Sequence, residues 1–362
     1  MSLKVQLEKR KIPAIERTTK EAWGAVREKY KQFFCENVYG LPVPAPTELR
    51  FEESEPEDPR FCAGLGISYA VTAHATLCGT EVSFPFRVCL PKTDHPVPFF
   101  VLSNFHQGEP NCYLPIAEII DRGFGVIYTY YKDVTSDDGD FQNGISRALY
   151  PNGGENRAPN STGKIQMWAW SNMRMLDYAL QNERFDAEHA AVIGHSRLGK
   201  TALVTGMMDE RFRYVISNNA GCSGDAITKC KEGERIEVIT RVFPYWFCPN
   251  YRERYLELDG ESGVMDFDQH MLLATVAPRI LMVGSAERDI WADPVSEKLC
   301  CIAAGAAWEN LGKVGFIAPD EEPVIGENDT EGSVCYHHRA GEHYLSRRDW
   351  CAYMDAIDKK RK

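Results

Sequence analysis

The sequence has no long hydrophobic run, no excess of basic residues and no pair of cysteines at a metal-binding spacing. Its longest apolar stretches, such as 97–102 and 279–283, are far shorter than the ~20 residues needed to span a bilayer, which excludes a membrane protein. Lys and Arg number 41 against 52 Asp and Glu, a net charge of −11, and no basic patch is visible. Nucleic acid and anionic membranes are therefore not expected as partners.

The twelve cysteines include no C-x-x-C pair, which excludes the common zinc and redox motifs. They are expected to be mostly reduced, buried, small apolar residues. The N-terminal stretch MSLKVQLEKRKIP is charged and has no apolar segment of the kind found in export signals. We therefore expect a cytoplasmic protein, unless a leader has been removed.

With 362 residues, 44% hydrophobic and 26% charged, the chain has an ordinary globular composition. Apolar residues at helical spacing predict an amphipathic helix over 14–37, and period-two alternation predicts a hairpin over 66–90. Strand and helix patterns alternate from Val97 onward. The expected strands are 97–105, 125–131, 189–196, 214–221 and 279–285, and the expected helices are 112–124, 164–182, 198–208, 268–276, 294–312 and 346–359.

Such alternation is typical of an α/β fold: a mostly parallel central sheet with helices on both faces, a three-layer sandwich. Residues 1–60 are expected to form an N-terminal helical extension packed on a single main domain, 61–362. Two segments, about 133–164 and 222–267, are longer than usual connections and are expected to be site-forming insertions. The acidic residues 137–140 in the first lack the spacing of a calcium loop.

The segment VIGHSRLGKTAL joins a strand to a helix and allows two interpretations. Gly194, Gly199, Lys200 and Thr201 match a phosphate-binding P-loop. A P-loop also needs a magnesium-binding Asp after a later strand, but the next strand, 214–221, ends in asparagines. The nucleotide-binding interpretation is therefore disfavoured.

In the second interpretation, Ser196 is a nucleophile on a sharp strand-to-helix turn, as in α/β-hydrolases. Such a fold requires an acid and then a histidine on later strand ends. Asp289 is the preferred acid, ahead of Glu287 and Asp293 in the same loop, and His343 is the preferred histidine, ahead of His337 and His338. The imidazole would take the serine proton, and the carboxylate would hold the imidazole in the required tautomer.

At this point the sequence resembles the glucuronoyl esterases of carbohydrate esterase family 15, particularly the bacterial type. The hallmark Gly-x-Ser-Arg-x-Gly-Lys is present at 194–200. It explains why the second glycine lies three residues after Ser196, one residue later than in the general α/β-hydrolase motif. Further similar stretches are SNNAGCSG, Gly233-Glu234 ahead of FPYWF, FDQHMLLATVAPR, SAERDIWADP and RAGEH.

The resemblance implies nucleophile Ser196, base His343 and Arg197 as the oxyanion-stabilising residue. It also implies that Lys200, Glu234 and Trp291 bind the uronic acid. Two departures stand out. Many members carry the triad acid at the position that holds Asn219 here, whereas some bacterial members use the position of Asp289. The positions of a fungal disulfide hold His195 and Tyr344.

We therefore expect a serine carboxylic-ester hydrolase that acts on esters of glucuronic or 4-O-methyl-glucuronic acid through an acyl-enzyme, without a cofactor or metal. Its partner would be a carbohydrate ester related to plant cell wall xylan. The alternatives are a carbohydrate acetyl esterase with the same triad, an inactive carbohydrate-binding relative and, more remotely, the P-loop nucleotide binder. The sequence does not predict the oligomeric state.

Overall fold

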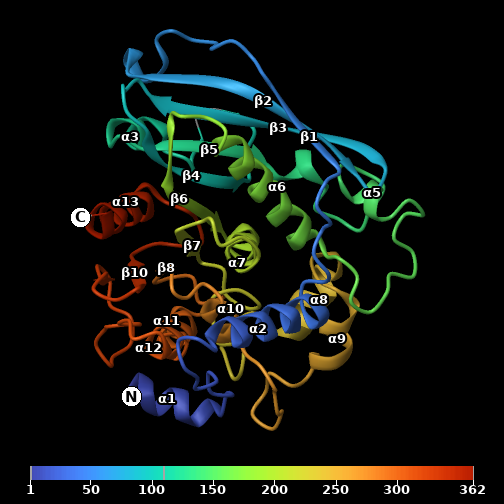
Figure 1. The fold of residues 1–362 in the computed structure, drawn as a ribbon. Coiled ribbons are helices and arrows are strands. Elements are labelled where there is room, and N and C mark those ends of the chain that lie inside the picture. The colour runs from blue at the N-terminus through green and yellow to red at the C-terminus, as the bar shows by residue number, and fades with distance from the viewer. Residues whose placement is uncertain (1, 109–110, 362) are drawn as a thin grey trace.

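A ten-stranded sheet runs through the whole molecule (Figure 1). The computed structural model describes residues 2–108 and 111–361. The strand order is β1-β2-β3-β5-β4-β6-β7-β8-β10-β9. The strands are β1 (Glu48–Glu53), β2 (Gly66–Leu77), β3 (Thr80–Pro91), β4 (Val97–Asn104), β5 (Gly125–Tyr130), β6 (Phe185–His195), β7 (Tyr214–Asn218), β8 (Ile280–Ala286), β9 (Asn328–Asp329) and β10 (Val334–Arg339).

The six central strands are parallel to one another: β5, β4, β6, β7, β8 and β10. Strands β1, β2 and β3 form an antiparallel flank beside them. The predicted hairpin is confirmed, since β2 pairs with β3 from Gly66↔Pro91 to Leu77↔Thr80. Because parallel strands place their carboxyl ends at one edge, the segments that follow β6, β7, β8 and β10 meet there. This mostly parallel sheet with helices on both faces is the α/β-hydrolase fold.

Alternate residues of the central strands enter two separate cores. Phe99 and Val101 of β4 belong to one core, whereas Phe100 and Leu102 belong to the other. This follows from the period of two in a strand, and burial of both faces accounts for the unbroken apolar sequence of β4. One face carries α6 (Lys164–Ala179), α7 (Arg197–Met208), α10 (Gln269–Ala274) and α11 (Pro294–Ala304); the other carries α3 (Ile116–Asp121) and α13 (Arg347–Arg361) (Figure 1).

The N-terminal segment differs from its prediction in two ways. The helix expected over 14–37 begins only at Trp23, as α2 (Trp23–Asn37), because the Thr19 carbonyl accepts from the N–H groups of Ala22 and Trp23 and forms a turn there. A short helix, α1 (Leu3–Arg10), precedes it. The segment also supplies a strand that was not predicted, β1, which pairs with β2. The division at residue 60 stays a prediction.

Other elements were missed or mistaken in length. The helix predicted over 294–312 is interrupted at Gly305, where a side chain would come within 3.1 Å of the Phe316 backbone nitrogen, and continues as α12 (Ala306–Asn310). The helix predicted over 112–124 is shorter than expected and consists of α3 (Ile116–Asp121). Strand β10 was not predicted. The remaining short helices are η1 (Phe61–Gly64), α4 (Tyr131–Val134), α5 (Ser146–Leu149), α8 (Ile236–Val242), η2 (Pro244–Trp246) and α9 (Pro249–Tyr255).

None of the helices within 2–108 and 111–361 combines the length and the apolar character that a bilayer crossing requires.

Candidate active site

Ser196 lies on a tight turn between β6 and α7, at the carboxyl edge of the sheet. Its backbone has φ 57° and ψ −126°, a conformation that a residue other than glycine rarely adopts. Its N–H donates to the Asn218 carbonyl at 2.9 Å, which ties the turn to β7. Gly194 is required here, because a Cβ at that position would lie 1.9 Å from the Leu198 carbonyl oxygen. This is the local geometry of a nucleophile elbow.

His343 bridges Ser196 and Asp289. Its Nδ1 lies 2.5 Å from Asp289 Oδ2, and its Nε2 lies 2.8 Å from Ser196 Oγ. Because an ionised carboxylate can only accept, Nδ1 carries the ring proton and Nε2 is free to accept from the serine hydroxyl. The arrangement can therefore remove the proton from Ser196 and hold the resulting imidazolium beside a negative charge.

Asp289 belongs to the loop that follows β8, as expected from the sequence. Its side chain is buried and accepts from three donors: His343, the Asn219 amide at 2.8 Å and the Ala292 N–H at 3.3 Å. Burial alone would raise the pKa of Asp289, but the bonds from His343 and Asn219 hold it below its ordinary value. The other two acids of this loop lie elsewhere: Asp293 caps α11, and Glu287 lies 3.8 Å from Arg288 at the surface.

The loop that carries His343 is shaped by a buried ion pair which the sequence analysis did not find. Arg339, at the end of β10, donates to Asp349 of α13 at 2.7 Å and to the carbonyls of Ala340, Glu342 and Tyr344. Asp349 is fully buried. The guanidinium thus binds carbonyls on both sides of His343, and these hydrogen bonds fix the position of His343.

The remaining histidine candidates are structural. His338 is buried, with its Nδ1 2.8 Å from Ser285 Oγ, and His337 lies 3.3 Å from Asp349. The His195 ring is tilted against that of His343, with ring centroids 4.5 Å apart, and its Nδ1 lies 2.9 Å from Asn218 Oδ1. Burial, together with the neighbouring His343, lowers the pKa of His195 to about 3, so this ring stays neutral next to the catalytic candidate.

A cavity of about 200 Å³ opens beside Ser196. Six of the seven predicted site residues line this cavity, and the seventh, Asp289, is buried behind them. Lys200, Glu234 and Trp291 therefore lie in the same cavity as Ser196. The Lys200 Nζ is buried, donates to the Ala220 carbonyl at 2.5 Å and keeps further N–H groups for a ligand. Burial lowers the pKa of Lys200, although the nearby Glu234 carboxylate opposes this. Trp291 is 53% exposed and presents an aromatic surface.

Arg197 also lines the cavity, and its surroundings were not predicted. The guanidinium carbon lies 4.6 Å from the centroid of the Trp246 ring, which itself stacks on Phe243. It forms an ion pair with Asp137 of the first insertion. The Arg197 N–H begins α7, and the first N–H groups of a helix have no partner within the helix, so they can face developing negative charge.

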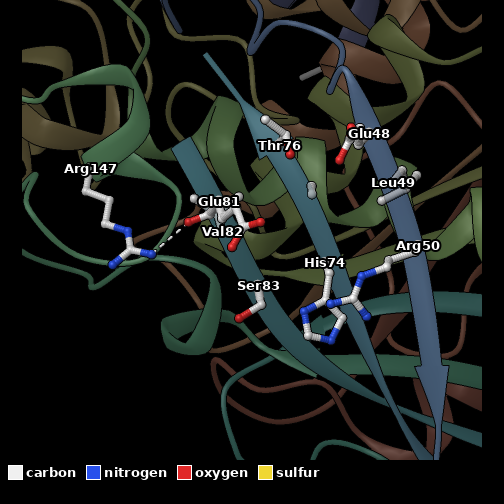
Figure 2. A pocket seen from close by; sticks show the side chains of 10 residues that line it. Glu48, Leu49, Arg50, His74, Thr76, Glu81, Val82, Ser83 and Arg147 are labelled. Carbon is white, nitrogen blue, oxygen red and sulfur yellow. Dashed lines mark hydrogen bonds between the residues drawn. The ribbon is translucent and has the colours of Figure 1, made fainter. Parts of the chain in front are cut away.

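A second hollow, of about 400 Å³, lies on the antiparallel flank β1–β3 (Figure 2). It is lined by polar and apolar residues of these strands, among them His74 and Ser83, and contains none of the predicted site residues. Arg147 of α5 donates there to the Glu81 carbonyl at 2.8 Å, which attaches the first insertion to the hairpin (Figure 2). Within the described residues, no group of three or more His, Cys, Asp or Glu could hold a metal ion.

Comparisons with known proteins identify the family of this chain. A family model described as "Glucuronyl esterase, fungi" matches residues 73–312. The carbohydrate esterase MZ0003, from an unknown prokaryotic organism, is 35% identical over 246 residues, which are 67% of this chain and 55% of that protein. The 4-O-methyl-glucuronoyl methylesterase 1 of Phanerochaete chrysosporium is 31% identical over 155 residues, 40% of this chain and 32% of that protein. The chain thus spans about half or less of the length of these curated relatives.

Solved structures resemble almost the whole chain. A glucuronoyl esterase from Solibacter usitatus has a TM-score of 0.85 at 28% identity, covering 97% of this chain and 100% of that one. A promiscuous esterase of carbohydrate esterase family 15, from a marine bacterial metagenome, has a TM-score of 0.82 at 27% identity, covering 97% and 98%. Because the family model covers most of the chain and includes the elbow, this chain belongs to the glucuronoyl esterase family, carbohydrate esterase family 15.

Proposed function

We propose that this chain hydrolyses esters of glucuronic acid or 4-O-methyl-glucuronic acid through an acyl-enzyme on Ser196. The observation that carries the proposal is the unbroken chain of contacts from Ser196 through His343 to Asp289, at 2.8 and 2.5 Å, beside an accessible cavity. Family membership supports the choice of substrate, since relatives are named as glucuronoyl methylesterases and glucuronoyl esterases.

The proposed reaction has two halves. His343 takes the proton of Ser196 as the serine oxygen attacks the ester carbonyl, and the Arg197 N–H and guanidinium stabilise the negative oxygen that develops. The protonated His343 then gives its proton to the departing alcohol, leaving the glucuronoyl group on Ser196. Water, activated by the same histidine, releases the acid and restores the serine.

The sugar of the acyl group would occupy the cavity. The ammonium group of Lys200 would donate to ring hydroxyls, the Glu234 carboxylate would accept from them, and the face of Trp291 would cover the apolar side of the ring. These three residues would bind the sugar on the acid side of the ester, and this distinguishes the proposal from an acetyl esterase with the same triad.

The test compares hydrolysis of benzyl glucuronate and 4-nitrophenyl acetate by the native protein and by Ser196→Ala. A matched control is Ser83→Ala, which removes an exposed hydroxyl from the second hollow (Figure 2). We expect turnover of benzyl glucuronate that is lost with Ser196→Ala and kept with Ser83→Ala. Turnover of the acetate alone would support the acetyl esterase, and no turnover of either would support a carbohydrate-binding relative.

A cytoplasmic location is part of the same proposal. All twelve cysteines are free thiols, which fits a reducing compartment. Fractionation of the native host tests it, and recovery of the protein outside the cell would refute it.

A further inference from the structure

The guanidinium of Arg197 does not reach the cavity as an isolated cation. It is paired with Asp137, whose side chain is only 4% exposed, against 25% for Arg197. An ion pair this far removed from water interacts strongly and is little screened by salt. The Asp137 carboxylate therefore acts on whatever occupies the cavity through Arg197, without lining the cavity itself.

Asp137 is also held in place by three donors from two other parts of the chain. Tyr131 Oη donates to its carboxylate at 2.8 Å, and Trp246 Nε1 donates at 2.7 Å. Tyr245 Oη donates to its backbone carbonyl at 3.0 Å. Burial, together with the nearby Asp137 carboxylate, raises the pKa of Tyr245 to about 12, so the tyrosine keeps the proton that it donates.

The loop around Asp137 is closed by a buried lysine. Lys164, at the start of α6, has a fully buried side chain. Its ammonium donates to the Ser136 carbonyl at 2.7 Å, to Ser136 Oγ at 2.9 Å and to the Asp140 carbonyl at 2.6 Å. The lysine thus holds the backbone on both sides of Asp137.

Each of the two cations that line the cavity has carboxylates nearby. Arg197 is paired with Asp137, and Lys200 lies near Glu234 and Asp225. The proposed substrate is a neutral ester, and its hydrolysis with one water gives an alcohol and a carboxylic acid, which ionises to a carboxylate by releasing a proton to solvent. An unpaired Arg197 would bind that carboxylate tightly, because guanidinium and carboxylate make paired, charge-assisted hydrogen bonds.

We infer that Asp137 is a positioning residue that fixes the Arg197 guanidinium and cancels its charge, so that the site releases its carboxylate product instead of retaining it. This inference rests on the proposed function, and it adds a reason for the ion pair that ester hydrolysis alone does not require. Arg197 still has hydrogen-bond donors for the transient oxyanion, because Asp137 engages only its Nη1.

The first experiment compares Asp137→Asn with Glu155→Gln, which removes the same charge from an exposed position of the same insertion. The measured quantities are kcat and KM for benzyl glucuronate and the inhibition constant of free glucuronate. For Asp137→Asn we expect the inhibition constant to fall about tenfold, with KM for the neutral ester changed less than about threefold. Glu155→Gln should change neither. An unchanged inhibition constant in a folded Asp137→Asn variant overturns the inference.

A second measurement needs no variant, in case Asp137→Asn does not fold. Glucuronate and the uncharged glucuronamide are compared as inhibitors of the native enzyme. A neutral ion pair predicts inhibition constants within about threefold of each other. Glucuronate binding about tenfold or more tightly than the amide refutes the inference, since a free cation would then face the product. Failure of the proposed function is distinguishable, because the native enzyme would then not hydrolyse benzyl glucuronate at all.

Discussion

Replacing Asp289 by asparagine tests the centre of the proposed mechanism. The change keeps the shape of the side chain, removes its charge and replaces one carboxylate oxygen with an NH2 donor. His343 Nδ1 lies 2.5 Å from Asp289 Oδ2, and this contact is where the imidazolium would be stabilised during the attack of Ser196. A neutral amide can still form a hydrogen bond but cannot offset the positive charge.

The magnitude follows from that distance. Two unit charges 2.5 Å apart interact by about 7 kcal/mol at an effective dielectric constant of about 20. At 1.36 kcal/mol per tenfold in rate, this corresponds to about a 10⁵-fold loss of kcat. The same substitution in a serine protease triad lowers kcat about 10⁴-fold. We therefore expect kcat for benzyl glucuronate to fall between about 10⁴- and 10⁵-fold, with KM little changed.

The assay is steady-state hydrolysis of benzyl glucuronate at pH 7, with thermal melting to show that the variant is folded. Glu287→Gln is the matched control, since it removes a carboxylate from the same loop at an exposed position; its kcat should stay within about twofold of the native value. If a folded Asp289→Asn variant keeps kcat within about tenfold of the native value, Asp289 is not the acid of the triad and the reasoning is refuted.

Three further predictions concern the surroundings of the triad. Gly194→Ala would bring a Cβ to 1.9 Å from the Leu198 carbonyl oxygen, so the elbow must shift; we expect a lower melting temperature and an activity loss of more than about tenfold. Arg339→Leu removes the guanidinium that pairs with the buried Asp349 carboxylate and should lower the free energy of unfolding in urea by about 3–5 kcal/mol. The pKa of His195 is lowered from 6.5 to about 3 by burial and by His343, so between these values only the unfolded chain binds a proton at this residue. The contribution of His195 to the free energy of unfolding is therefore complete above pH 6.5, and below it this contribution decreases by about 1.4 kcal/mol for each pH unit. Urea unfolding at several pH values should show that the difference in unfolding free energy between the native protein and His195→Asn changes with pH by this amount.

Each of these has a control or a contradicting result. Gly139→Ala places its Cβ in open space and should melt with the native protein. Arg347→Leu removes an arginine that is 70% exposed and paired with Glu118, and should cost less than about 1 kcal/mol; an equal effect of both arginine variants would contradict the role given to Arg339. A stability difference between native protein and His195→Asn that does not vary with pH would contradict the neutral state of His195.

The sequence alone predicted the fold class and most of the central strands. Both faces of strands such as β4 are buried, so these strands read as unbroken apolar runs between amphipathic helices, a pattern that allows few other folds. The chain order of serine, acid and histidine at successive strand ends predicted which side chains would meet, because the carboxyl ends of parallel strands share one edge. The structure places Ser196, Asp289 and His343 together at that edge.

The elements that were missed depend on contacts between distant segments. Strand β10 contains two histidines and an arginine, and its register with β8 is set by pairing that a local pattern does not record. The early part of the helix predicted over 14–37 has helical periodicity but is not helical, because α2 begins only after the turn at Thr19. The helix predicted over 294–312 is interrupted where residues 315–316 pack against Gly305. Periodicity shows which residues can be buried on one face, but not where another segment crosses that face.

The electrostatic surroundings of the site were decided by tertiary structure. Asp137 precedes Arg197 by 60 positions, and Arg339 meets Asp349 only because α13 folds back against β10. From the sequence, residues 137–140 were an acidic loop, and Lys164 was the first residue of a helix. A buried charge is stable only where partners from other segments surround it, and those partners come together only when the chain has folded. The sequence therefore determined which groups could do the chemistry, and the folded structure determined how their charges are oriented and balanced.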